Sequence, residues 1–262
     1  MRRYLRVYWA LVKASFTEQT EYHTNFWFEI IASLLSLATG LLFFHFVYRY
    51  VDNIAGWNVF EVYFLIGTNA LINALYGMNI GSKMGDVARS VKEGTLDTIL
   101  LKPVSSQFWF SAKGISLRSC FEILASLGIM AYVISHLEIH ITFTKIIIYF
   151  SLTLCSVLLK YAFSFIIVTT SFWVVRVDAL RAIFMEIFRF SGYPAEIFRG
   201  ATKILFTFVF PMAIIANVPA RVFVKVFHPQ SALYLLFLVF MFILLSNLYW
   251  HLGLRHYQSA GG

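Results

Sequence analysis

The sequence predicts an all-α integral membrane protein, in which six transmembrane helices follow an interfacial amphipathic helix. Three observations predict this fold class: 60% of the residues are hydrophobic, only 13% are charged, and the mean hydropathy is +0.74. A chain of this composition has too little polar surface to cover a soluble core. Its 262 residues accommodate about six spans of roughly 20 residues, so we expect residues 1–262 to form a single transmembrane domain.

Residues 1–26 are expected to form the interfacial elbow helix. Apolar side chains such as Tyr8 and Trp9 share one helical stripe, and basic side chains point away from it. The segment does not resemble a signal peptide, because Lys13 and Glu18 interrupt any apolar core. Such a helix lies in the membrane interface before the chain enters the bilayer.

Six apolar runs are long enough, or nearly so, to cross a bilayer once as a helix. They cover about 27–48, 59–80, 119–136, 143–175, 203–222 and 231–253. If the N-terminus is inside, sixteen of the 21 Lys and Arg residues are cytoplasmic and four are external. Because basic residues concentrate in cytoplasmic loops, both termini are expected in the cytoplasm. The cytoplasmic segments then include 81–118, after span two, and 176–203, after span four.

The segment 81–118 interrupts the apolar pattern with a helix, a hinge, a second helix and a stop. The first helix, in "SKMGDVARSVKEG", has one apolar face and ends at Gly94, which can adopt a left-handed conformation. We expect Thr95 to cap the second helix, "LDTILLK", and Pro103 to end it. That helix is expected to expose three apolar side chains: Leu96, Ile99 and Leu100.

Two interpretations of this segment are open: a loop that packs on its own bundle, or a rigid knob whose apolar face enters a groove of a soluble partner. Four charged residues would form the polar rim of that face: Lys92, Glu93, Asp97 and Lys102. The whole predicted contact comprises Val91, Lys92, Glu93, Gly94, Thr95, Leu96, Asp97, Ile99, Leu100, Lys102 and Pro103.

The segment 176–203 contains another amphipathic helix, in "RVDALRAIFMEIFRFSG". Phe184 and Phe188 lie on its apolar face, and Arg181 lies at the edge of that face. We expect this helix to be cytoplasmic, with a second contact surface that comprises Arg181, Phe184 and Phe188.

Lys160 is the most costly residue in the predicted spans, because it lies about midway between Lys145 and Arg176, too far from either flank to reach water. It is expected either to be satisfied at an internal or subunit interface or to line the substrate path. Depth selects none of three candidate partners: Glu29, Glu61 and Glu122.

Pro211 lies in the middle of the fifth run and is expected to kink it, with Pro219 as a further irregularity. This pattern by itself is typical of a single kinked crossing.

Several classes of function have little support. The chain lacks a Gly-x-x-x-x-Gly-Lys-Ser/Thr loop, so it cannot cradle nucleotide phosphates in that way. His136 and His140 have the spacing of a helical metal pair, but Leu137 stands where the zinc protease pattern needs Glu. The net charge of +8 fits loops that face anionic lipid better than it fits nucleic acid binding. We therefore expect a non-catalytic chain that binds no cofactor and no metal.

Four motifs in order, "EGTLDTILLKPVSSQFW", "YPAEIFRG", "FPMAIIANVPAR" and "LRHYQSAGG", resemble permease subunits of ABC-2 type exporters. The chain is most similar to a bacterial branch with a Gly-x-Leu-Asp-x-x-Leu-x-Lys-Pro run after span two. The resemblance implies that this run docks in a cleft of an ATPase subunit and couples ATP hydrolysis there to movement of the permease. Its residues here are Gly94, Leu96, Asp97, Leu100, Lys102 and Pro103.

The resemblance also allows a re-entrant hairpin around Pro211, which the sequence cannot distinguish from a single kinked crossing. It further implies the assembly and its location. Two permeases, identical or related, would join two ATPases in a bacterial inner membrane, and ATP and Mg²⁺ would bind only the ATPases. The main alternative is a stand-alone secondary transporter or channel-like protein that uses Lys160 in ion coupling. A third is an assembly or anchoring protein without transport. The substrate does not follow from the sequence.

Overall fold

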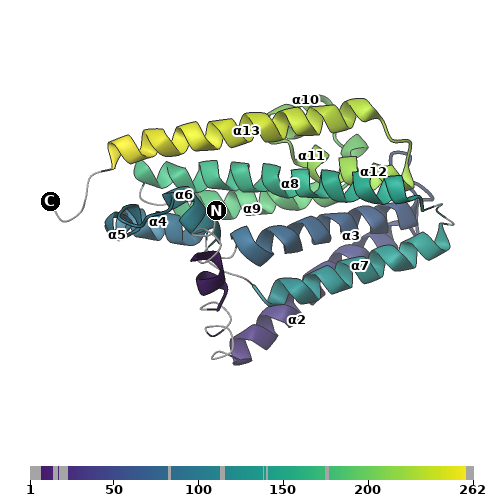
Figure 1. Cartoon of the computed structure of the whole chain (residues 1–262). Helices are drawn as coiled ribbons and strands as arrows, with labels where there is room; N and C mark the ends of the chain where they lie inside the picture. The colour runs from purple at the N-terminus through teal and green to yellow at the C-terminus, as the bar shows by residue number, and fades with distance from the viewer. Residues whose placement is uncertain are drawn as a thin grey trace.

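The computed structural model is an α-helical bundle, which confirms the predicted fold class. It describes residues 7–13, 17, 23–81, 84–112, 116–137, 139, 141–174 and 177–257. These residues contain no β-strand. Five helices are long and apolar enough to cross a membrane: α2 (His23–Val47), α3 (Val59–Tyr76), α7 (Arg118–His136), α8 (Phe143–Thr169) and α13 (Pro229–His256). They lie lengthwise side by side (Figure 1).

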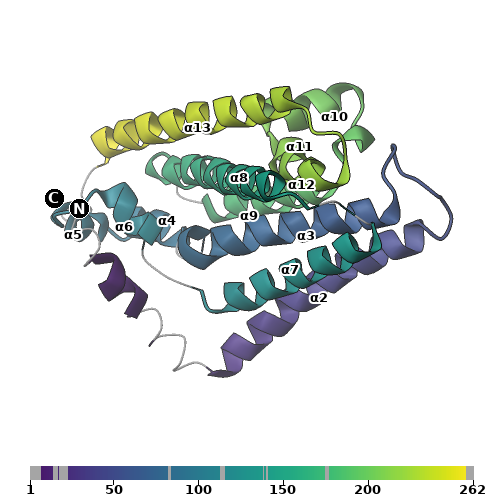
Figure 2. The same cartoon turned by 45° about the vertical axis from the view of Figure 1, so that its right-hand side comes forward.

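Helix α8 is the centre of the bundle, and it is the most buried of the five long helices. It packs against α3 and α13 and also contacts the short helices at both ends (Figure 2). The core between these helices contains large side chains such as Phe64, Tyr149 and Leu159. Helix α3 begins with a capping box, in which Asn58 and Glu61 satisfy each other's backbone N–H groups.

The short helices gather at the two ends of the bundle. Helices α4 (Gly85–Lys92), α5 (Leu96–Leu100) and α6 (Ser106–Ala112) lie at the end where α13 finishes, and we call residues 84–112 the knob. The opposite end carries the turn between α2 and α3 and the helices α10 (Gly200–Ile204), α11 (Met212–Ile215) and α12 (Asn217–Val224) (Figure 1).

The segment 176–203 does not lie on one side of the bundle, so that prediction is wrong. Helix α9 (Val177–Arg189) starts beside α4 at the knob end. Its 13 residues rise about 20 Å, and the 3₁₀ turn η3 (Phe190–Gly192) reaches the middle of α3, where Ser191 bonds to Asn69. Glu196 then reaches the opposite end, where it accepts a hydrogen bond from Trp57. Residues 177–196 are therefore the fifth pass through the bundle.

The predicted fifth span forms a re-entrant hairpin instead. Residues 200–209 and 212–224 are two helical arms bent by 72° at a break that contains Pro211. Both ends of the hairpin lie near Trp57, because Glu196 contacts Trp57 and Lys225 contacts Gly56. Pro219 makes no second break, since it falls in the first turn of α12, where its missing N–H has no helical partner to lose.

The predicted elbow helix is described only in part. Residues 7–13 form a short helix with an exposed Trp9, as an interfacial helix would present it. Residues 1–6, 14–16 and 18–22 lie outside the described residues. Helix α2 already begins at His23, within the range predicted for the elbow.

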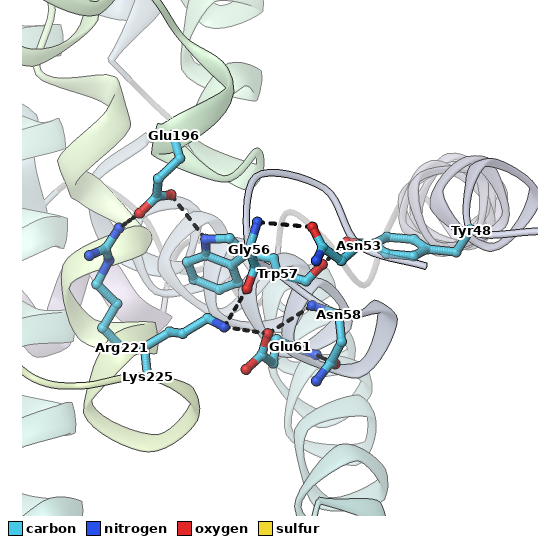
Figure 3. Close-up of polar contacts among 9 residues, drawn as sticks. All are labelled: Tyr48, Asn53, Gly56, Trp57, Asn58, Glu61, Glu196, Arg221 and Lys225. Atoms are coloured by element: carbon cyan, nitrogen blue, oxygen red, sulfur yellow. Dashed lines mark hydrogen bonds and ion pairs between the residues drawn. The ribbon is translucent and has the colours of Figure 1, made fainter. Parts of the chain in front are cut away.

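A polar clasp joins the hairpin to the turn between α2 and α3 (Figure 3). At its centre is Trp57, which is 1% exposed and donates its indole N–H to Glu196 Oε2 at 2.9 Å. Glu196 also pairs with Arg221, whose guanidinium lies 5.8 Å from the centre of the Trp57 ring. The end of the fifth pass and helix α12 are thus held by one indole.

Lys225 forms the second half of the clasp. Its Nζ donates to the Gly56 carbonyl at 2.7 Å and pairs with Glu61 Oε2 at 2.7 Å (Figure 3). Tyr48 donates its hydroxyl hydrogen to the Trp57 carbonyl at 2.7 Å, and burial raises the pKa of Tyr48 to about 12, so the donor is retained at physiological pH. The clasp comprises Tyr48, Gly56, Trp57, Glu61, Glu196, Arg221 and Lys225.

Trp57→Phe should lower the free energy of unfolding by about 1–3 kcal/mol, because Glu196 loses a donor while most ring packing remains. Trp57→Ala should cost about 3–5 kcal/mol, since it also leaves a cavity. Denaturant unfolding in detergent micelles measures both changes. The control is Trp27→Phe, at an exposed position of α2, which should change stability by less than about 0.5 kcal/mol. A Trp57→Phe protein as stable as wild type would show that the indole N–H does not hold the clasp.

Candidate functional site

Helix α5 of the knob is fixed to the bundle by apolar side chains that point inward. Leu96 is 0% exposed and Ile99 is 6% exposed. Both pack in a cluster with Met84, Val87, Phe110, Phe165, Val168 and Trp250, which come from α4, α6, α8 and α13. The prediction that Leu96 and Ile99 are offered to a partner is therefore wrong, because their own bundle already buries them.

The exposed tip of the knob is one residue further along the chain. Leu101 is 86% exposed and Leu100 is 43% exposed. Leu101 follows the last turn of α5, where its backbone N–H bonds to the Asp97 carbonyl at 3.2 Å. Two adjacent apolar side chains therefore project from a base that cannot yield without unpacking the bundle. Leu101 is not among the predicted contact residues, although it is an apolar residue directly before the predicted contact residue Lys102.

Backbone geometry sets the angles of the knob. Gly94 has φ of +71°, a left-handed conformation that strains any residue with a side chain. Thr95 stands at the start of α5, but its side chain makes no capping bond. Lys102 places its ammonium 4.0 Å from the centre of the Trp109 ring, which ties the chain beyond α5 to α6. Pro103 follows in an exposed position.

The predicted polar rim is present in part. Lys92 and Glu93 are exposed at the end of α4, while Asp97 and Lys102 are half-buried. Val91 is also half-buried and packs against the cluster around Trp250. The Trp250 indole N–H donates to Ser106 Oγ at 3.1 Å, so α13 is bonded directly to the start of α6.

Lys160 is a buried cation near the middle of α8. It is 6% exposed, and its Nζ donates to Asn73 Oδ1 on α3. The same Nζ lies 4.8 Å from the centre of the Tyr76 ring and 5.2 Å from that of Phe188. No described carboxylate forms an ion pair with it. Of the candidate partners, Glu61 pairs with Lys225 and Glu122 with Arg118.

A line of polar side chains continues from Lys160 along α3. Asn69, one turn from Asn73, accepts a hydrogen bond from Ser191 Oγ at 2.6 Å. Gly192 follows, and an added Cβ there would lie 3.0 Å from the Asn69 amide nitrogen. Helices α3 and α8 and the fifth pass therefore meet through amide and hydroxyl groups instead of apolar packing alone.

The predicted second cytoplasmic contact faces the inside of the bundle instead. Phe188 is buried, and its ring packs on Phe163 of α8 at 5.7 Å between centroids. Phe184 packs on the same ring at 5.6 Å. Arg181 reaches over Gly85 of α4, where an added Cβ would collide with its guanidinium. The apolar face of α9 is thus occupied by α8, because α9 is a pass through the bundle and not a surface helix.

Among the residues that the structure describes, no group of three His, Cys, Asp or Glu side chains could hold a metal ion. His136 stacks on Phe60 with 5.2 Å between the ring centres and packs on Tyr132. His140, the other member of the predicted pair, lies outside the described residues. What the described geometry provides is an exposed apolar tip on a rigid base and a buried cation in the bundle.

These features can be set beside known proteins. The family model of the ABC-2 family transporter protein matches residues 34–261. This match includes the knob, Lys160, the fifth pass, the hairpin and α13. No curated protein and no solved structure matches the chain. Because the family model covers most of its length, the chain belongs to the ABC-2 family of transporter proteins.

Proposed function

We propose that this chain is the membrane-spanning permease subunit of an ABC exporter, which forms the substrate path as a dimer and is driven by separate ATPase subunits. The observation that carries the proposal is the exposed pair Leu100 and Leu101, fixed by the buried Leu96 and Ile99 in a chain of the ABC-2 family. An apolar tip of this kind suits a groove in a soluble partner. A rigid base lets a push on the tip reach α8 and α13.

The ATPase is expected at the knob end of the bundle. Counted along the sequence, thirteen of the 21 Lys and Arg residues fall in segments 1–26, 81–118, 176–181 and 254–262, and six fall in segments 49–58, 137–145 and 196–225. The difference between these two counts is smaller than the predicted sixteen against four, because residues 177–196 are a pass through the bundle and not a cytoplasmic segment. The excess of basic residues is still in the same segments. It supports a cytoplasmic knob and cytoplasmic termini in a bacterial inner membrane. ATP and Mg²⁺ would bind the partner, since this chain lacks a phosphate-binding loop.

The outward face of α9 supports a dimer. Glu186 and Arg189 form an ion pair at 3.3 Å with side chains 64% and 70% exposed. They flank Phe188, which contacts the buried Lys160, so they lie at the depth of the bundle's middle. Exposed charges at that depth are too costly to face acyl chains. A second permease, with a polar path between the two copies, would cover them.

Leu101→Asp should weaken binding of the partner ATPase about tenfold or more while the permease stays folded. The reason is that an exposed leucine contributes about 1.5–3 kcal/mol when a partner buries it, and each 1.4 kcal/mol is tenfold in affinity. Co-purification from native membranes identifies the ATPase, and titration of the purified subunits measures the affinity. The matched control is Leu101→Met, which keeps an apolar side chain and should bind as wild type does. Equal ATPase binding by wild type and Leu101→Asp would remove the knob from the contact.

Ile183→Cys should form a disulfide between two copies of the chain in native membranes, because Ile183 lies exposed on the outward face of α9. The background should lack Cys120 and Cys155, the two native cysteines. A mild oxidant followed by non-reducing electrophoresis gives the readout. Ile147→Cys, an exposed position on α8, is the control and should remain monomeric. Monomer alone at position 183, together with labelling of the thiol by a lipid-soluble maleimide, would contradict this interface.

A further inference from the structure

Two cations, Arg181 of α9 and Lys160 of α8, lie in succession between these two helices, and the proposed contact with the ATPase uses neither of them. Arg181 and Phe188 are seven residues apart on α9, so they are separated by about 10 Å along its axis. Phe188 packs against the ammonium of Lys160. Neither Arg181 nor Lys160 forms an ion pair with a carboxylate among the described residues. Lys160 is buried and Arg181 is half-buried. A buried cation such as Lys160 is costly without a counter-charge, and an anionic group would lower that cost.

An outer hollow of about 350 Å³ leads to Arg181 from the knob end. Its charged lining is balanced, with three cations and three carboxylates: Arg89, Lys92, Arg181, Asp86, Glu93 and Asp178. This mouth therefore has little preference for one sign of charge. If the site prefers anions, that preference has to arise deeper than this outer hollow, beyond the three carboxylates.

Arg181 also lines the next, inner hollow, together with Ser164, Phe184 and Phe188. This hollow is narrow, with a volume of about 10 Å³, enough for roughly one water molecule. Its walls are mostly apolar, and its far side is Phe188, which contacts Lys160. The order from the surface is therefore a balanced mouth, Arg181, an apolar constriction and Lys160.

Lys160 has capacity for a ligand at the end of this path. An ammonium has three donors, and the structure gives Nζ one hydrogen bond, to Asn73. The rings of Tyr76 and Phe188 contact it without accepting a full hydrogen bond. The hydroxyl of Tyr76 is also buried, and it interacts with the Ser164 hydroxyl without a full hydrogen bond among the described residues. These groups would be satisfied by an acceptor that carries negative charge.

We propose that the two hollows and Lys160 form a binding site for an anionic amphiphile, a molecule with a carboxylate or phosphate on an apolar body. Arg181 binds the anionic head first, the aromatic side chains of α9 contact the apolar body, and Lys160 binds the head when the constriction opens. The proposal rests on the proposed permease function and names the chemical class of its substrate. The head and the body are both required, because the cations alone do not explain the aromatic walls.

The test is equilibrium binding of radiolabelled oleate to the full chain in phosphatidylcholine nanodiscs, with empty nanodiscs as background and oleyl alcohol as the neutral analogue. Oleate should bind about tenfold or more tightly than oleyl alcohol, because a hydrogen-bonded charge contributes roughly that factor. Lys160→Met should abolish the difference, and Lys160→Arg should keep it. Lys203→Met, an exposed lysine of α10, is the matched control and should behave as wild type.

Gly85→Ala tests the path without changing any charge. The added methyl group would displace the Arg181 guanidinium, while alanine is unstrained at the first residue of α4, where Gly85 does not have a positive φ. We expect about tenfold weaker oleate binding with no loss of thermal stability. If Lys160→Met does not fold, the test depends on Gly85→Ala and Lys160→Arg. Equal binding of oleate and oleyl alcohol by wild type, or unchanged oleate selectivity in every variant that folds, overturns the site.

Competition identifies the source of the anion. Displacement of oleate by phosphatidylglycerol in the nanodisc supports a membrane lipid, and failure of phosphatidylglycerol with retained oleate selectivity supports a free amphiphile. If inorganic phosphate displaces oleate and oleyl alcohol binds as tightly as oleate does, the proposed site for an anionic amphiphile is overturned. The binding assay needs no ATPase, so its outcome separates the two proposals. If the chain binds oleate selectively but no ATPase co-purifies with it, only the proposed exporter function is refuted. If an ATPase co-purifies but oleate binding is not selective, only the proposed binding site is refuted.

Discussion

The burial of Leu96 and Ile99 against α8 and α13 is the contact on which the rest of the account depends. It fixes a five-residue helix, too short to be stable alone, at the end of the bundle. It also directs Leu101 away from the bundle, because the inward positions are occupied. Movement of that tip relative to the bundle would require the packed cluster around Trp250 to separate. A force on the tip is therefore transmitted to α8 and α13.

The same helix that supports the knob carries the buried cation. Phe165 and Val168 of α8 belong to the cluster under α5, and Lys160 is five residues before Phe165, about 8 Å along the axis. Further along, Ser156 Oγ donates to the Ile215 carbonyl of the hairpin at 2.7 Å. Helix α8 thus contacts the knob, the polar line and the hairpin. The clasp around Trp57 joins that hairpin to the start of α3.

Hydropathy predicted five long helices, periodicity predicted the helical knob segment, and the proline predicted the break at Pro211, because each depends on local sequence. Hydropathy could not identify the fifth pass, since α9 is short for a span and carries Glu186 and Arg189 at mid-depth. Periodicity also could not orient α5, because its three apolar residues and the following Leu101 leave its inward side undetermined. The clasp was unpredictable in another way: Trp57 and Glu196 are 139 residues apart, and no local pattern pairs them.

The most direct test of the central claim is photo-crosslinking from position 101 in membranes that hold the complete transporter. A photoreactive side chain in place of Leu101 should crosslink to a separate ATPase chain, whereas the same group in place of the buried Ile99 should crosslink only within this chain. Crosslinks from position 101 that reach only lipid or this chain, in membranes that are transporting, would contradict the account.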